Sequence, residues 1–172
     1  MKRGGLPGAA LACALGLLVG GCAYRLGPTN GEAAGARSIQ VVPLQNNVLI
    51  PRLGDAVTVS LRRNLQQDGT YRLETRGRGD VILSGAVVSY DRSELSYQPT
   101  DVLTPRDFRI IITADLTARE ADTGKVLMNR QVTGFTTVRL GADLKSAERQ
   151  AIPLAAEDLA RNAIAMLVDG TW

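Results

Sequence analysis

Residues 108–117 read Phe-Arg-Ile-Ile-Ile-Thr-Ala-Asp-Leu-Thr, and this stretch decides the fold. Its even-numbered residues are apolar and most of its odd-numbered ones are polar, which is the period of two of a strand with one face on a core. The turn formers Asp-Thr-Gly-Lys follow at 122–125 and lead into a second strand-like run, Val126 to Val138. Because this connection is short, the two runs should pair as an antiparallel hairpin.

Two further strands are predicted on the N-terminal side of this hairpin. Val81 to Tyr90 is apolar and β-branched enough for a well-buried strand, in which we expect Gly85 to mark a bulge. Ser38 to Leu44 is a short strand that ends at Pro43. The segment Glu94 to Asp107 is long for a connection, and it is either a partner-contacting loop or the extended end of a hairpin.

Two amphipathic helices complete the pattern. Residues 53–67 carry Leu53, Val57, Leu61 and Leu65 at a spacing of four and stop at Asp68-Gly69. About Asp143 to Val168 forms the other helix, in which Pro153 predicts a kink or a separate short turn before it. The face expected to pack on the sheet comprises Ile152, Ala155, Leu159, Ala163 and Met166. The order β-α-β-β-β-α predicts an α+β two-layer sandwich, with two helices on a mixed, mainly antiparallel sheet of about four strands.

The composition excludes several classes of function. The chain has 172 residues and no His, which removes the commonest general base and zinc ligand. Asp122-Thr123-Gly124 matches the aspartic protease triplet, but only one copy exists, at a position where a turn is required. Beyond the first 21 residues, 18 basic residues face 17 acidic ones, so no strong basic excess indicates nucleic acid. We therefore expect no enzyme, cofactor or metal site.

The N-terminus resembles that of an exported lipoprotein. Lys2 and Arg3 precede the apolar run Leu11 to Val19, which is too short to span a bilayer as a helix. Val-Gly-Gly-Cys at 19–22 resembles the bacterial lipobox, so Cys22 is the expected lipidation site. The predicted organisation is a signal peptide (1–21), a lipidated N-terminus and flexible spacer (22–37) and one domain (38–172). Ala23, where Asp would favour inner-membrane retention, favours the outer membrane.

Segments along the whole mature chain resemble the LptE family of lipopolysaccharide-assembly lipoproteins. The lipobox is followed at once by Tyr-Arg-Leu at 24–26, and the remaining segments occur in the family's order. These segments are Gly21–Leu26, Val41–Asn47, Pro51–Leu53, Leu65–Leu73, Gly79–Gly85 and Glu148–Ile152.

The resemblance implies a non-catalytic lipoprotein that plugs and helps to assemble LptD, a large outer-membrane β-barrel, and binds lipopolysaccharide during its delivery to the cell surface. It also implies a basic ligand-binding residue at the start of the last helix, which Lys145 matches. A second basic position is implied before the Phe108 strand, where Arg106 and Arg109 are the nearest cations. Sixteen of the 18 basic residues after position 21 are Arg, whose guanidinium binds phosphate in a bidentate fork.

The main alternative is an outer-membrane lipoprotein that activates a peptidoglycan synthase, because Ile39 to Leu44 also resembles TolB-like domains. The spacer Gly27 to Gly35 argues against this, since it reaches only about 15 to 20 Å. A hydrolase whose carboxylate pair converges only in the fold is a third reading.

Overall fold

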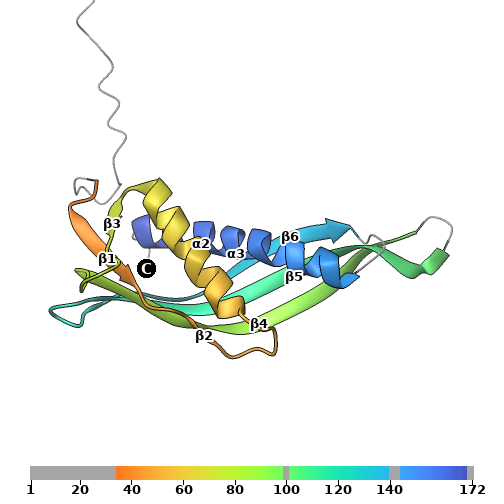
Figure 1. Ribbon diagram of the computed structural model, residues 1–172, viewed down its shortest axis with the longest axis horizontal. Helices are drawn as coiled ribbons and strands as arrows, with labels where there is room; N and C mark the ends of the chain where they lie inside the picture. The colour runs from red at the N-terminus through yellow and green to blue at the C-terminus, as the bar shows by residue number, and fades with distance from the viewer. Residues whose placement is uncertain (1–33, 99–100, 140–143, 170–172) are drawn as a thin grey trace, which may run out of the picture.

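The computed structural model describes residues 34–98, 101–139 and 144–169. Two helices lie on the same face of one curved sheet, and the other face carries no helix (Figure 1). The predicted two-layer α+β class is confirmed. The elements are β1 (Arg37–Val41), β2 (Gln45–Asn46), α2 (Leu53–Asp68), β3 (Tyr71–Leu73), β4 (Val81–Gln98), β5 (Asp101–Glu120), β6 (Val126–Arg139) and α3 (Leu144–Asp169).

The sheet has six strands in the order β3-β1-β4-β5-β6, with β2 also paired to β4. β4, β5 and β6 form an antiparallel meander, whereas β1, β2 and β3 run parallel to their neighbours. The mixed, mainly antiparallel sheet is as expected, but two strands were missed. β2 and β3 are two and three residues long, too short to show a period of two.

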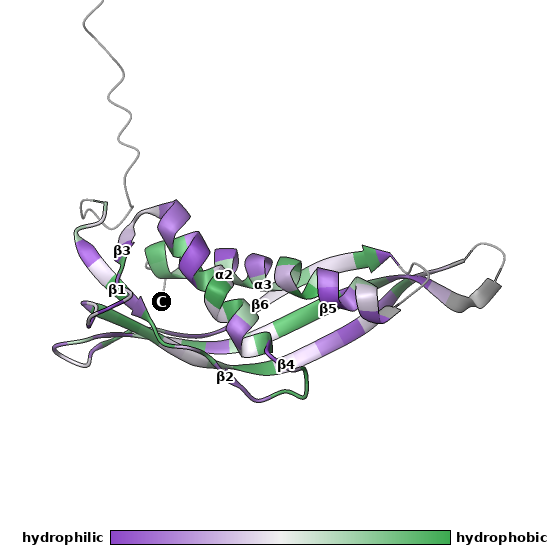
Figure 2. Ribbon diagram, in the orientation of Figure 1, coloured by the Kyte–Doolittle hydropathy of each residue, from purple (hydrophilic) through white to green (hydrophobic). Residues whose placement is uncertain are grey.

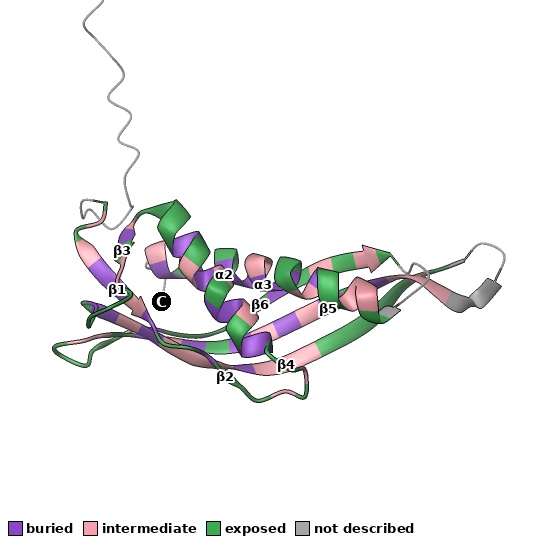
Figure 3. Cartoon of the chain, viewed as in Figure 1, coloured by how far each residue is buried: buried purple, intermediate pink, exposed green. Residues whose placement is uncertain are grey.

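β5 confirms the alternation on which the prediction rested. Its even-numbered residues from Phe108 to Ala118 are buried on the helix face, whereas Arg109, Asp115 and Arg119 are exposed on the opposite face, here called the open face. β6 pairs with β5 from Asp107↔Arg139 to Arg119↔Val126, so the hairpin forms as predicted. Buried segments gather beneath the helices (Figure 3), where they build a single core.

The segment Glu94 to Asp107 is the extended end of a hairpin. β4 and β5 stay paired out to Gln98↔Asp101, and this hairpin projects beyond α3 (Figure 1). The bulge expected at Gly85 is wrong, because Gly85 stays in register with Leu116 and the first register shift lies between Val87 and Ser89. A Cβ on Gly85 would lie 3.0 Å from Leu116 Cδ2, so this glycine permits close packing against β5.

α2 extends one residue beyond the predicted range. Its four spaced leucine and valine residues are fully buried, and Gly69, at φ 73°, ends the helix by donating its N–H to the Leu65 carbonyl at 3.2 Å. Hydrophobic and hydrophilic residues share each helix (Figure 2), as expected for helices that pack with one face on a core.

α3 passes through Pro153 as one helix, so of the two predicted outcomes, a kink or a separate short turn before Pro153, the separate turn does not occur. Ala155, Leu159 and Ala163 are buried as predicted. Met166 is 41% exposed, and the buried face continues instead through Ile164 and Leu167. The cause is geometric, since a buried stripe drifts around a helix whose period is 3.6 residues.

Candidate functional site

The predicted lipidation site, Cys22, lies outside the described residues. In the part of the chain that the structure describes, no helix is long and apolar enough to cross a membrane. These residues also contain no group of three or more His, Cys, Asp or Glu side chains placed to hold a metal ion. The Asp122-Thr123-Gly124 triplet forms the turn between β5 and β6, where Gly124 adopts φ 71° and donates its N–H to the Glu120 carbonyl at 3.0 Å.

The predicted ligand-binding cations come from two elements. Lys145 is the second residue of α3 and is exposed, which agrees with the expected place at the start of the last helix. Arg106 and Arg109 both lie on β5. Because side chains alternate along a strand, Arg109 falls on the open face, opposite to Phe108. Arg106 lies where the register of β4 and β5 shifts between Ser96 and Tyr97, so regular alternation does not assign it to a face.

Arg109 stacks on an aromatic ring of the open face. Its guanidinium carbon lies 5.1 Å from the centre of the Phe135 ring, within the range of a cation–π contact. Phe135 is 51% exposed on β6. The stack fixes the direction of Arg109 and leaves an accessible pair of a cation and an aromatic ring.

Arg92 is a functional candidate that the sequence analysis missed. It lies on β4 and binds Glu148 of α3, with 2.6 Å between Nη1 and Oε1. Its guanidinium also lies 5.4 Å from the centre of the Phe108 ring. The only signal in the sequence was that Tyr90, Arg92 and Glu94 occupy alternate positions. The face of the sheet to which they belong could not be predicted, because it depends on the bulge between Val87 and Ser89.

Tyr90 completes this cluster on the helix face. Burial raises the pKa of its phenol, and the negative charge of Glu148, to which it is hydrogen-bonded, raises it further. Arg92 acts in the opposite direction on the same pKa. The cluster of Tyr90, Arg92, Phe108 and Glu148 therefore attaches the first turns of α3 to the sheet, one helical turn from Lys145.

A second cluster lies on the open face at the base of the projecting hairpin. Asp107 accepts a hydrogen bond from Ser96 Oγ at 2.6 Å and one from Arg139 Nε at 3.1 Å. The Ser96 hydrogen bond, followed by that of Arg139, holds the pKa of Asp107 below its ordinary value. Both Arg92 and Arg139 thus have carboxylate partners, which reduces their capacity to bind an external phosphate.

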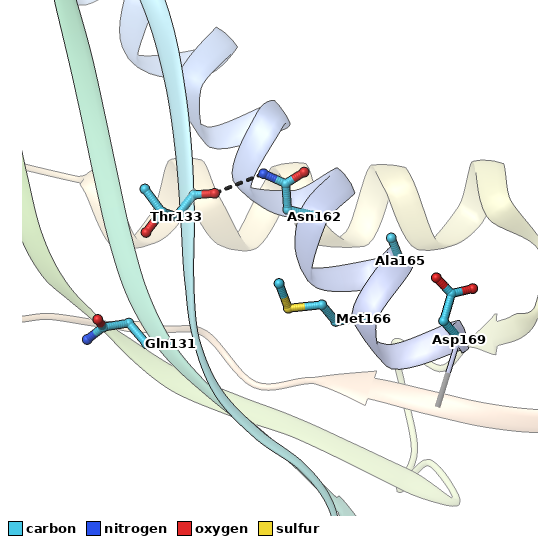
Figure 4. A pocket seen from close by; sticks show the side chains of 6 residues that line it. All are labelled: Gln131, Thr133, Asn162, Ala165, Met166 and Asp169. Atoms are coloured by element: carbon cyan, nitrogen blue, oxygen red, sulfur yellow. Dashed lines mark hydrogen bonds between the residues drawn. The ribbon is translucent and has the colours of Figure 1, made fainter. Parts of the chain in front are cut away.

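A groove runs beside the edge of the sheet, between β6 and α3 (Figure 4). Its volume is about 450 Å³. Asn162 crosses one end, where its Nδ2 donates to the Thr133 carbonyl at 2.9 Å. The lining residues are Gln131, Thr133, Asn162, Ala165, Met166 and Asp169.

Solved structures with the same fold include lipoproteins and proteins without an assigned role. A Xanthomonas campestris protein aligns with a TM-score of 0.59 at 12% identity, over 85% of this chain and 91% of that one. A putative lipoprotein from Caulobacter crescentus aligns at 0.54 and 14%, over 76% and 87%. A hypothetical protein from Chlamydia trachomatis aligns at 0.55 and 9%, over 76% and 94%. These identities support the fold alone.

Sequence comparison identifies the family directly. No curated protein matches the chain by sequence. The family model named LptE and described as lipopolysaccharide-assembly matches residues 36–167, which covers every strand and all but the last two residues of α3. This confirms the resemblance found in the sequence segments. The chain belongs to the LptE family of lipopolysaccharide-assembly proteins, a family of non-enzymatic lipoproteins.

Proposed function

We propose that this lipoprotein plugs an LptD-type outer-membrane β-barrel, helps to assemble it and binds lipopolysaccharide during its delivery to the cell surface. The observation that carries this proposal is the family match over residues 36–167. Cys22 anchors the chain in the outer membrane through its acyl chains, which makes release from the membrane negligible.

The open face of the sheet supports a position inside a barrel. Cross-strand hydrogen bonds join its polar side chains, between Gln131 Nε2 and Asp115 Oδ1 at 2.9 Å and between Thr113 and Thr133 at 3.4 Å. Thr117 and Asn129 make a third such pair at 3.4 Å. The lumen of a large outer-membrane barrel is polar, so a hydrophilic sheet face suits contact with its inner wall.

The basic residues at the start of α3 and at the base of the projecting hairpin support lipopolysaccharide binding. Lys145 lies in the first turn of α3, and Arg106 lies on β5 at the base of the projecting hairpin. We assign both to the phosphate contacts of lipopolysaccharide. Arg109 is a separate contact on the open face. A ligand as large as lipopolysaccharide reaches both faces of a hairpin that projects beyond the core. A guanidinium binds phosphate with two parallel hydrogen bonds, which favours Arg at such positions.

The test is to solubilise outer membranes in mild detergent, purify the full chain by a C-terminal tag and identify what copurifies in fixed ratio. A large β-barrel at one to one is the expected result. Copurification of a periplasm-facing peptidoglycan synthase would instead favour the alternative function, which is activation of that synthase. The absence of any stable partner would overturn the proposal.

A further inference from the structure

We infer that the exposed edge of β6, together with the groove beside it, binds an extended segment of the barrel partner by strand addition, with a Lys or Arg of that segment near Asp169. This inference rests on the proposed function for the identity of the partner. The binding surface itself follows from the hydrogen bonding of β6.

β6 is the last strand of the sheet, and α3 covers only part of its free edge. Asp158 Oδ2 accepts the Phe135 N–H at 3.0 Å, and Asn162 Nδ2 donates to the Thr133 carbonyl at 2.9 Å. Both helix residues lie on one face of α3, four positions apart. They satisfy two backbone groups that β5 cannot reach.

The direction of these two bonds identifies the remaining free groups. In an antiparallel pair, residues whose N–H and C=O point away from the neighbouring strand alternate. Thr133 and Phe135 point outward, so Gln131 and Asn129 do as well. Within residues 34–98, 101–139 and 144–169, no hydrogen-bond partner reaches the N–H or C=O of Gln131 and Asn129, or the Thr133 N–H.

The groove extends between β6 and α3 from Asn162 towards Asp169. Ala165 and Met166 follow Asn162 on the same side of α3 and form the apolar part of the lining (Figure 4). The small Ala165 leaves room beside β6, and Met166 is a flexible side chain that adapts to varied neighbours. A free strand edge beside an adaptable apolar wall is the arrangement that binds an extended peptide by strand addition.

Charge indicates the chemistry of the segment. Asp169 lines the groove in the last turn of α3, where the helix dipole adds partial negative charge. The last turn of α3 contains no basic residue, and no described side chain forms an ion pair with Asp169. The negative end of the groove therefore selects a segment that carries Lys or Arg.

Hydrogen exchange tests the inference without any substitution. The full chain is compared in the same detergent alone and in its copurified complex with the barrel, over peptides that span residues 126–135. Strand addition predicts slower exchange at the outward amides of 129, 131 and 133. The inward Val132 amide is already in the β5 ladder and serves as the internal reference. Unchanged exchange at the outward amides would overturn the inference.

Two variants of one residue separate backbone pairing from side-chain contact. Gln131→Pro removes an outward N–H that takes no part in the β5 ladder, a place where edge strands tolerate proline. We expect about a tenfold or greater loss of barrel affinity for Gln131→Pro. Gln131→Ala keeps the backbone amide and removes only the side chain, so it should lose much less barrel affinity than Gln131→Pro does. Circular dichroism establishes that both variants fold, and equal binding by both would contradict strand addition.

The role of the negative charge of Asp169 is tested with two variants. Asp169→Lys reverses the charge and should weaken barrel binding more than Asp169→Asn, which only removes it. If the unaltered chain copurifies with no barrel, the proposed function fails. If the barrel copurifies and the outward amides and the Gln131→Pro variant behave as in the free chain, only the strand-addition inference fails.

Discussion

Gly134 of β6 lies directly against the backbone of α3 at Leu159. A Cβ at position 134 would be 2.5 Å from Leu159 Cα and from the carbonyl oxygen of Ala155. Contacts this short do not occur between real Cβ atoms and backbone. The absence of a side chain at this one strand position therefore sets the distance between helix and sheet.

Gly134→Ala should force α3 away from β6 and lower the free energy of unfolding by about 2 kcal/mol or more. Urea unfolding followed by circular dichroism measures the change. The matched control is Gly77→Ala, because a Cβ at that exposed position would lie 3.7 Å from the nearest atom of Glu74. Equal stability of the two variants would contradict the packing argument.

Arg52→Gly should stabilise the protein. Arg52 precedes α2 at φ 61° and makes no side-chain cap, so a residue with a Cβ occupies the left-handed region. Glycine removes that strain but also raises the conformational entropy of the unfolded chain. The net increase in the free energy of unfolding should be about 0.5–1 kcal/mol. Arg52→Ala keeps the strain and serves as the control in the same urea experiment. A gain shared by both variants would show that loss of the Arg side chain, and not the φ angle, is the cause.

Asp80 should make stability depend on pH in the acid range. Its carboxylate accepts hydrogen bonds from Ser38 N and Ser38 Oγ, both at 2.7 Å, and these bonds hold its pKa below the ordinary value of 3.8. A lowered folded-state pKa contributes stability above pH 3.8 that is lost as the pH falls through the folded pKa. Asp80→Asn should flatten this part of a plot of urea midpoint against pH.

A suitable control for Asp80→Asn is Asp122→Asn, which removes an acidic charge from the exposed turn between β5 and β6. This variant should keep the steep acid dependence. If Asp80→Asn keeps it as well, the hydrogen bonds from Ser38 do not link protonation to folding.

Glu148→Gln should lower the pKa of Tyr90 towards that of a free phenol. The pKa would stay above the ordinary value of 10.0, because burial is the largest cause of the increase. Arg92→Gln should shift the same pKa upward, since the Arg92 charge lowers it. NMR titration of ring-labelled tyrosine, assigned with Tyr90→Phe, measures both. Shifts in the same direction would contradict the charge arrangement of the cluster.

The double substitution of Lys145→Ala and Arg106→Ala should weaken lipopolysaccharide binding about tenfold, because each cation can make a charge-assisted hydrogen bond to phosphate. Retention of lipopolysaccharide on the immobilised full chain measures the effect. Lys125→Ala with Arg130→Ala removes the same charge from exposed positions near the opposite end of β5 and β6. A similar loss in both pairs would indicate non-specific attraction, and no loss in the first pair would make the site assignment wrong. The single variant Arg109→Ala tests whether a cation on the open face contributes to lipopolysaccharide binding.

Elements governed by local rules could be predicted from the sequence. The alternation of residues 108–117, the turn at Asp122 to Lys125 and the spacing of four from Leu53 to Leu65 each depend on neighbours within a few positions. The two-layer class follows from the order of these elements. The lipobox at Cys22 and the expected cation at Lys145 are also sequence signals, and their roles remain predictions.

Elements that depend on distant partners were decided only by the tertiary structure. β2 and β3 exist because β4 and β1 offer them hydrogen bonds, and the shift after Val87 places Arg92 opposite Glu148. The sequence by itself determined the type of each long element, because propensity and hydrophobic period act along the chain. The packing of α3 decides which faces and edges of the sheet stay uncovered, such as the outer edge of β6. This packing is fixed by contacts between residues far apart in the chain, such as Gly134 and Leu159.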